Sequence, residues 1–169
     1  MKKKIAIVIT RFIPGGASQV VKNIIDHGEE EFYFTLFTGC EGISEEEKEE
    51  FQAKYEIVFI NSLVRQISPL KDYSAYLVMK KEFIKSNFTL VHTHTSKAGF
   101  LGRLAAKNAG IKNIIHSTHG SIYMPDSRIP SLPNINIYKK KLLSAEKILA
   151  PHTNFQLGLS QAEYDFYIK

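Results

Sequence analysis

Short apolar runs alternate with amphipathic stretches along almost the whole chain. The run over residues 4–10 is unbroken, as in a strand of a parallel sheet that is buried on both faces. The pattern predicts strands over residues 4–10, 32–38, 55–60, 88–93, 111–117 and 147–150. It predicts a first helix that ends at Gly28 and further helices over residues 44–54, 70–85, 96–110, 137–145 and 155–169.

This alternation of strands and helices predicts the fold class. Strands joined by helices form parallel sheets with helices on both faces, so we expect a doubly wound α/β domain of the Rossmann-like type over residues 1–169. A Rossmann-type strand order is the commonest option for such a sheet. The chain is long enough to bury one sizeable core.

Local signals refine three of the helices. Ser44 and Glu47 form the spacing of a capping box, and Ser96 is a candidate helix cap with Gly110 as the stop. The expected apolar side of the helix over residues 70–85 consists of Tyr73, Tyr76, Leu77, Phe83 and Ile84. The expected stripe of the helix after Ser96 consists of Phe100, Leu101, Leu104 and Ala105.

Composition and charge narrow the class of partner. The net charge of +5 is uneven, because residues 26–56 hold eleven acids and two bases while the rest of the chain is basic. This basic remainder indicates either solvated helix faces, which we favour, or an anionic partner such as a nucleotide, a phospholipid carrier or a membrane surface. No nucleic-acid-binding signature is present, and a single cysteine, Cys40, fits a cytoplasmic protein.

Two glycines lie between the first strand and the first helix. Gly15 and Gly16 would let the backbone approach a ligand at a helix amino end, which favours anions. The turn matches neither the dinucleotide fingerprint nor the phosphate loop. A tight turn without a ligand is therefore the alternative.

Four histidines follow or end two of the predicted strands. His92 and His94 point to one face of their strand, and His116 and His119 close the next. We expect His92 and His116 to be structural and His94 and His119 to lie at the mouth of the sheet, where ligands bind. A zinc site is disfavoured, because neither cluster includes an acidic residue.

Polar residues beside these histidines complete the candidate site. Ser96 and Lys97 would offer amides, a hydroxyl and a cation to a phosphate or a sugar, unless they only cap the helix. A proline-bearing loop over residues 121–136 follows Gly120, and loops of that length are often functional. Covalent catalysis is disfavoured, because no nucleophile elbow is present and Cys40 has no neighbouring histidine.

The run HTHTSKAGFLGRLAA over residues 92–106, with IHSTHG over residues 115–120, resembles the amino-terminal domain of GT-B glycosyltransferases of family 4. The turn over residues 15–18 is similar to that family's glycine loop. The resemblance implies transfer of a sugar from a nucleotide diphosphate sugar to a glycan or lipid-linked acceptor, with retention and without a metal or other cofactor. It also implies work at the cytoplasmic side, in polysaccharide biosynthesis.

The resemblance assigns roles to particular residues. His119 would be the catalytic residue, which positions and polarises the transferred sugar. Gly15 and Gly16 would present amides to donor phosphates or acceptor. The acceptor side of the substrate-binding site would consist of His94, Ser96, Lys97 and Gly120.

Members of the family carry a second, carboxyl-terminal domain that holds the donor with an arginine/lysine pair and an E-x7-E motif. This sequence contains none of that carboxyl-terminal half, so we expect the second domain to be supplied in cis or in trans and the chain alone to be inactive. The lysines at 139–141 indicate a solvated helix start or a peripheral contact with the inner face of a membrane. A non-catalytic Rossmann-like module for an anionic ligand or partner protein is the main alternative, and a histidine metal hydrolase is a third.

Overall fold

The structure, a computed structural model, describes residues 2–120, 144, 146–158 and 160–161. The strands of this part are β1 (Lys3–Arg11), β2 (Phe32–Gly39), β3 (Ile57–Phe59), β4 (Leu90–His94), β5 (Asn113–Ser117) and β6 (Phe155–Leu157). The helices are α1 (Gly16–Gly28), α2 (Glu45–Lys54), α3 (Pro69–Ser86), α4 (Ser96–Asn108) and the 3₁₀ helix η1 (Ala150–His152).

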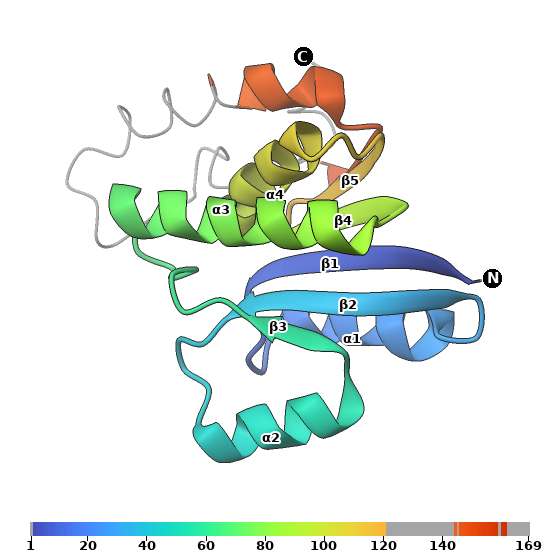
Figure 1. The fold of residues 1–169 in the computed structure, drawn as a ribbon, viewed down its shortest axis with the longest axis vertical. Coiled ribbons are helices and arrows are strands. Elements are labelled where there is room, and N and C mark those ends of the chain that lie inside the picture. The colour runs from blue at the N-terminus through green and yellow to red at the C-terminus, as the bar shows by residue number, and fades with distance from the viewer. Residues whose placement is uncertain (1, 121–143, 145, 159, 162–169) are drawn as a thin grey trace.

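The strands form one parallel sheet in the order β3-β2-β1-β4-β5-β6. This is the Rossmann-type order, in which β1 and β4 are the central neighbours. Helices α3 and α4 cover one face of the sheet, and α1 lies on the other (Figure 1). The predicted fold class, a doubly wound sheet with helices on both faces, is confirmed.

Two apolar layers hold these helices on the sheet. Alternate residues of β1 serve opposite layers: Ala6 and Val8 pack with α3 and α4, whereas Ile7 and Ile9 pack with α1. All four side chains are fully or almost fully buried. A strand that is buried on both faces needs an unbroken apolar sequence, which explains the first run of the chain.

The helix ends agree with most of the local signals. Ser44 and Glu47 form the predicted capping box at the start of α2, with Ser44 Oγ accepting from the Glu47 amide at 3.1 Å. Gly110 follows α4 in the left-handed conformation, as expected for a helix stop. Ser96 is the first residue of α4 and not its cap, because Thr95 holds the cap position without a side-chain cap bond.

The predicted face of α3 is wrong in part. Phe83 is buried and Tyr76 is partly buried against the core, as expected, but Tyr73, Leu77 and Ile84 are exposed. The other buried residues of α3 are Ala75 and Met79, which are spaced by four with Phe83. The aromatic residues dominated the sequence pattern, but a small alanine and a flexible methionine allow α3 to pack closely beside α4. In α4, the fully or almost fully buried set includes Leu101 and Ala105 of the predicted stripe, with the two glycines and Arg103.

The predicted last strand over residues 147–150 is also wrong. Residues 146–149 are helical and η1 follows, so that the last strand of the described part is β6. The helix predicted over residues 155–169 is therefore wrong over Phe155–Leu157. An apolar run as short as Ile148, Leu149 and Ala150 does not distinguish a strand from a buried helical turn. Here Thr153 Oγ1 donates to the Leu149 carbonyl at 3.0 Å and secures the helical end.

Two glycines of α4 explain how closely this helix approaches the sheet. A Cβ atom on Gly99 would lie 2.2 Å from His116 Cε1, and one on Gly102 would lie 2.8 Å from Thr93 Cγ2. Any side chain at either position would push α4 away from β4 and β5. The glycines in the conspicuous run over residues 92–106 therefore serve packing.

Candidate functional site

The carboxyl ends of β1, β4 and β5 meet at one edge of the sheet. The register pairs Ile9 with His94 and His94 with Ser117, so the residues that follow each strand emerge side by side. The glycine turn follows β1, and His119 follows β5 by two residues. This is the edge at which open α/β sheets bind ligands.

Three imidazoles lie next to one another at this edge, and both neighbouring ring pairs are tilted. The ring centroids of His92 and His94 are 4.1 Å apart, and those of His94 and His119 are 5.1 Å apart. His94 Nδ1 lies 2.8 Å from His119 Nε2, within hydrogen-bonding distance. On the other side, His92 Nε2 lies 2.9 Å from Ser117 Oγ. The predicted neighbourhood of His94 and His119 is thus present, and His92 belongs to the same cluster.

Burial keeps His92 and His94 neutral. The pKa of His94 is lowered to about 2. Burial is the largest cause, and the neighbouring His92 and His119 contribute to the lowering. Burial, with a smaller contribution from His119, lowers the pKa of His92 to about 4. At neutral pH both rings carry one proton each and no charge. They can therefore donate or accept hydrogen bonds, but they add no positive charge to the site.

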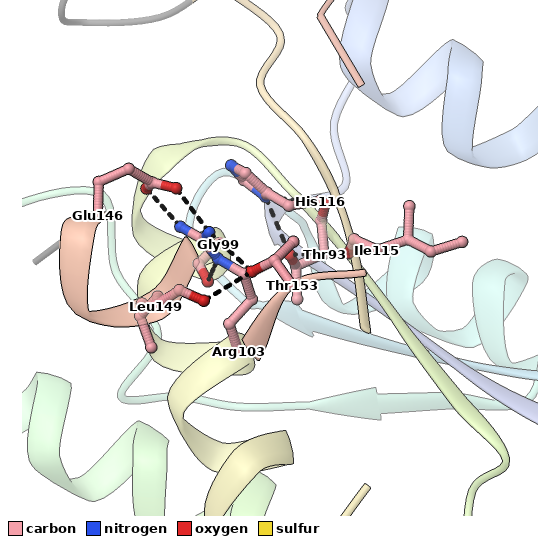
Figure 2. Close-up of polar contacts among 8 residues, drawn as sticks. All are labelled: Thr93, Gly99, Arg103, Ile115, His116, Glu146, Leu149 and Thr153. Atoms are coloured by element: carbon pink, nitrogen blue, oxygen red, sulfur yellow. Dashed lines mark hydrogen bonds and ion pairs between the residues drawn. The ribbon is translucent and has the colours of Figure 1, made fainter. Parts of the chain in front are cut away.

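His116 lies apart from these three imidazoles, and its role is structural. Its Nδ1 is 3.0 Å from Thr93 Oγ1, and its ring packs against Gly99 (Figure 2). Burial and the positive charge of Arg103 lower the pKa of His116 to about 3. A buried, neutral, hydrogen-bonded histidine at this position agrees with the prediction for His116.

A pair of threonines connects the glycine turn to the histidine segment. Thr10 Oγ1 is 3.0 Å from Thr95 Oγ1 and accepts from the Ala98 amide at 3.2 Å. Thr95 has a φ of 67°, which is costly for a β-branched residue, and His119 has a φ of 53°. Such strain concentrates at functional sites, because it needs support from the surrounding structure. The contacts of Thr10 supply that support.

The glycine turn leaves open space above its backbone. Among the described residues, a Cβ atom on Gly16 would meet nothing within 4 Å, and one on Gly15 would meet only the Ile13 carbonyl at 3.9 Å. Packing within this described part of the chain does not explain either glycine, in contrast to Gly99. Gly16 begins α1, where amides point outward without helical partners. The turn can therefore bring backbone amides close to an anionic group.

The other residues of the predicted substrate-binding site differ in their surroundings. Ser96 is half-buried at the start of α4. The Lys97 ammonium donates to Asp72 Oδ1 at 2.6 Å and to the Gln66 carbonyl, which ties α4 to the start of α3. Gly120 is exposed with a φ of 84°. In this structure Lys97 is occupied within the protein, whereas Ser96 and Gly120 border the histidines.

Sequence reasoning missed several contributors to this edge. Thr10 and Thr95 belong to no recognisable motif. A hydroxyl side chain at the end of a buried strand is only a weak signal of a functional site. Arg103 of α4 forms a buried ion pair with Glu146. Arg103 is one of the bases outside residues 26–56, for which solvated helix faces were expected. The proline-bearing loop and the lysines at 139–141 lie outside the described residues.

Two other observations bear on the kind of site. Within the described ranges, no three histidine, cysteine, aspartate or glutamate side chains are grouped so that they could hold a metal ion. A hollow of about 430 Å³ is lined by Lys107, Lys112, His152 and their neighbours. It lies at the opposite edge of the sheet, beside the residues that precede β5 and β6, and so is not part of the histidine site.

Comparison with known proteins places this chain in a family. The family model described as Glycosyltransferase Family 4 matches residues 14–168. The chain therefore belongs to Glycosyltransferase Family 4, as the resemblance in the sequence implied. A curated relative is the Escherichia coli UDP-Gal:alpha-D-GlcNAc-diphosphoundecaprenol alpha-1,3-galactosyltransferase, which is 39% identical over 70 residues. That match covers 41% of this chain and 18% of the relative.

Solved structures share the fold at low identity. Sucrose-phosphate synthase from Thermosynechococcus elongatus is 12% identical with a TM-score of 0.69, over 98% of this chain and 44% of its own. UDP-N-acetylglucosamine 2-epimerase from Rickettsia bellii is 18% identical with a TM-score of 0.57, over 94% of this chain and 45% of its own. The chain thus spans less than half of these proteins, and a fold shared by a synthase and an epimerase does not define the reaction.

Proposed function

We propose that this chain forms the acceptor-side half of a glycosyltransferase that moves a sugar from a nucleotide diphosphate sugar to a lipid-linked glycan. The observation that carries the proposal is the 39% identity over 70 residues to an enzyme whose name specifies a UDP-galactose donor and a diphosphoundecaprenol-linked acceptor. Membership of Glycosyltransferase Family 4 supports sugar transfer in general. Donor, acceptor, retention and independence of metal belong to the proposal.

The chemistry of the site suits this reaction. In the transfer, the bond between the anomeric carbon and the diphosphate breaks, and the acceptor hydroxyl forms the new bond. The transition state is positive at the sugar and negative at the departing diphosphate, so donors aimed at the diphosphate lower the barrier. The amides at Gly15 and Gly16 would serve the diphosphate. The imidazole of His119 would position the sugar, and the acceptor's proton would leave with the diphosphate.

An exposed apolar stripe on α3 supports a membrane-borne acceptor. Leu70, Tyr73, Leu77 and Ile84 are 86%, 63%, 44% and 59% exposed and lie on one side of the helix, opposite Ala75 and Met79. Exposed lysines flank this stripe at positions 71, 81 and 85. An apolar stripe bordered by lysines is typical of a helix that lies in the surface of an anionic membrane. No described helix is long and apolar enough to cross a bilayer.

The stripe also lies close to the site. The Lys97 contacts with Asp72 and the Gln66 carbonyl fix the start of α3 beside the start of α4. A lipid-linked sugar at the histidine edge would therefore have its lipid within reach of Leu70 and Tyr73. We propose α3 as the membrane contact of this half.

A transfer assay tests the proposal. The full-length polypeptide that carries this chain, in detergent, is given UDP-[¹⁴C]galactose and N-acetylglucosaminyl-diphosphoundecaprenol, with and without EDTA. We expect a labelled lipid product in both conditions. NMR of the product should show that the transferred sugar keeps the anomeric configuration that it has in the donor. Loss of product in EDTA, or inversion, would refute those parts of the mechanism. No transfer from a panel of nucleotide sugars, with retained binding of an anionic ligand or a protein, would favour the non-catalytic module.

A further inference from the structure

His94 and His119 share one hydrogen bond, and its polarity follows from burial. His94 Nδ1 lies 2.8 Å from His119 Nε2. His94 is completely buried, whereas His119 is half-buried at the rim. A neutral imidazole has one N–H and one acceptor nitrogen, so one ring donates and the other accepts. Which ring donates determines the tautomer of both.

The second nitrogen of His94 distinguishes the two arrangements. His94 Nε2 is buried and has no hydrogen-bond partner among the residues that the structure describes. If His119 donated, the proton of His94 would lie on Nε2, as a buried N–H without an acceptor. If His94 donates from Nδ1, only a lone pair remains unpaired at Nε2. Unpaired buried N–H groups are the rarer of the two in proteins, so donation from His94 is favoured.

The surrounding rings keep His94 in this orientation. His92 packs on the ring of His94 with centroids 4.1 Å apart, and His92 is itself held by Ser117 Oγ. The pKa of His94, about 2, excludes a doubly protonated ring at neutral pH. His94 therefore has no surface for the acceptor contact that the sequence suggested, and its only described polar contact is with His119.

We infer that His94 is a positioning residue, whose Nδ1–H donates to His119 Nε2 and thereby holds His119 in the tautomer protonated at Nδ1. In this state His119 cannot take up a proton at Nε2, because that lone pair is already engaged. Nε2 of His119 would therefore not act as a general base in the transfer. This consequence for transfer rests on the proposed function, whereas the tautomer itself does not.

The tautomer is measured directly by ¹⁵N NMR of the histidine-labelled chain at pH 7.5, from two-bond couplings within each ring. His119 is assigned by its loss in His119→Gln. We expect His119 and His94 to be protonated at Nδ1. In His94→Leu, which removes the donor, His119 should change to the Nε2–H form that free histidine prefers. In His94→Asn, whose amide N–H replaces Nδ1–H, His119 should keep the Nδ1–H form.

A wild-type His119 protonated at Nε2, or one that keeps Nδ1–H in His94→Leu, would overturn the inference. If His94→Leu does not fold, the tautomer of His94 in the wild type still decides: Nδ1–H supports the inference and Nε2–H overturns it. In the full-length transferase we expect kcat to fall about tenfold or more in His94→Leu and to be restored in His94→Asn, with the acceptor KM little changed. Absence of transfer in every form, with the expected tautomers, would refute the proposed function alone.

Discussion

Arg103 and Glu146 form a bidentate ion pair across 43 residues of chain, with Nη1 to Oε1 at 2.7 Å and Nη2 to Oε2 at 2.6 Å (Figure 2). The Arg103 side chain is 2% exposed and that of Glu146 is 10% exposed. Arg103 also donates to the Gly99 carbonyl at 2.9 Å and to Thr153 Oγ1 at 3.2 Å. One guanidinium thus joins α4 to the segment that leads into β6.

This relationship predicts the effect of Glu146→Ala. Removal of the carboxylate leaves a buried guanidinium without its counter-charge, and we expect the free energy of unfolding to fall by about 3–5 kcal/mol. Urea denaturation measures that loss, and hydrogen exchange at the Thr118 amide, which bonds to the Leu157 carbonyl, would show whether β6 opens first. The matched control is Lys54→Gln, which breaks an exposed pair with Asp26 and should change stability little. Equal stability of both variants would contradict the role of the buried pair.

Acid should destabilise the fold well above the range in which carboxylates titrate. In the folded chain the pKa values of His92, His94 and His116 are lowered to about 4, 2 and 3, while the unfolded chain takes up these protons near 6.5. Below pH 6.5 the unfolded state therefore binds more protons, and stability falls as the pH is lowered toward the folded pKa values. Each histidine contributes a slope of up to about 1.4 kcal/mol per pH unit.

The measurement is the free energy of unfolding at pH 7.5, 6.0 and 5.0. Most of the change should occur between pH 6.0 and 5.0, where three histidines act together. His27→Gln removes an exposed histidine of α1 and should leave this dependence unaltered. The same stability at pH 7.5 and at pH 5.0 would show that the three rings are not neutral and buried as described.

Two glycines offer a matched pair of substitutions. In Gly99→Ala the new methyl would lie 2.2 Å from the His116 ring, which its bonds to Thr93 hold in place, so we expect a loss of about 1–3 kcal/mol or more. In Gly16→Ala the methyl meets nothing within 4 Å, and stability should be unchanged or slightly higher. Urea denaturation tests both. In the full-length protein, Gly16→Ala should weaken the binding of UDP measured by calorimetry, and undiminished binding would argue against a ligand at this turn.

His119→Ala in the full-length transferase tests the assigned role of that residue. We expect turnover to fall tenfold or more, as the loss of one well-placed donor does in other enzymes, without unfolding because the side chain is only half-buried. Steady-state transfer rates measure the effect, and thermal melting checks the fold. His27→Ala is the control. Unchanged turnover would remove His119 from the reaction.

The sequence predicted the part of this site that follows from strand direction. Because the carboxyl ends of parallel strands lie at one edge, His94 and His119 could be placed together before their contact was known, although not the tautomer that the contact sets. The contact between Thr10 and Thr95 could not be predicted, since it depends on β1 and β4 being neighbours. Strand order is a property of the whole chain and leaves no local pattern.

The predictions from the sequence were wrong where the size or charge of a side chain did not indicate whether it is buried. Arg103 is one of the bases for which solvated helix faces were expected, because its partner Glu146 lies 43 residues further on, between the predicted helix over residues 137–145 and the predicted strand over residues 147–150. Gly99 and Gly102 lie in the run that carries the family resemblance, and their neighbours on β4 and β5 show that they allow close packing. On α3 the large apolar residues suggested the buried face, but of these only Phe83 is buried there, together with the small Ala75 and Met79.

That exposed stripe on α3 gives the last prediction, which concerns membrane binding. The triple variant Leu70→Ser, Tyr73→Ser, Leu77→Ser should bind vesicles of phosphatidylglycerol and phosphatidylcholine with an affinity lower by about tenfold or more. Each substitution removes apolar area that would enter the bilayer surface. Its melting temperature should not fall, since these side chains are exposed in the folded chain. Co-sedimentation with vesicles measures the binding. Tyr33→Ser, which removes an exposed aromatic residue of β2, is the control.

A second variant separates charge from apolar contact. Replacing the lysines at 71, 81 and 85 by glutamine should remove the salt-sensitive part of the binding, because each lysine near an anionic surface contributes about 1 kcal/mol. Binding to vesicles of phosphatidylcholine alone should then be weak and similar for this variant and the wild type. If the serine variant binds like the wild type, α3 does not face the membrane. Its stripe would then be available to the second domain, and its exposure to protease in the full-length protein would distinguish that case.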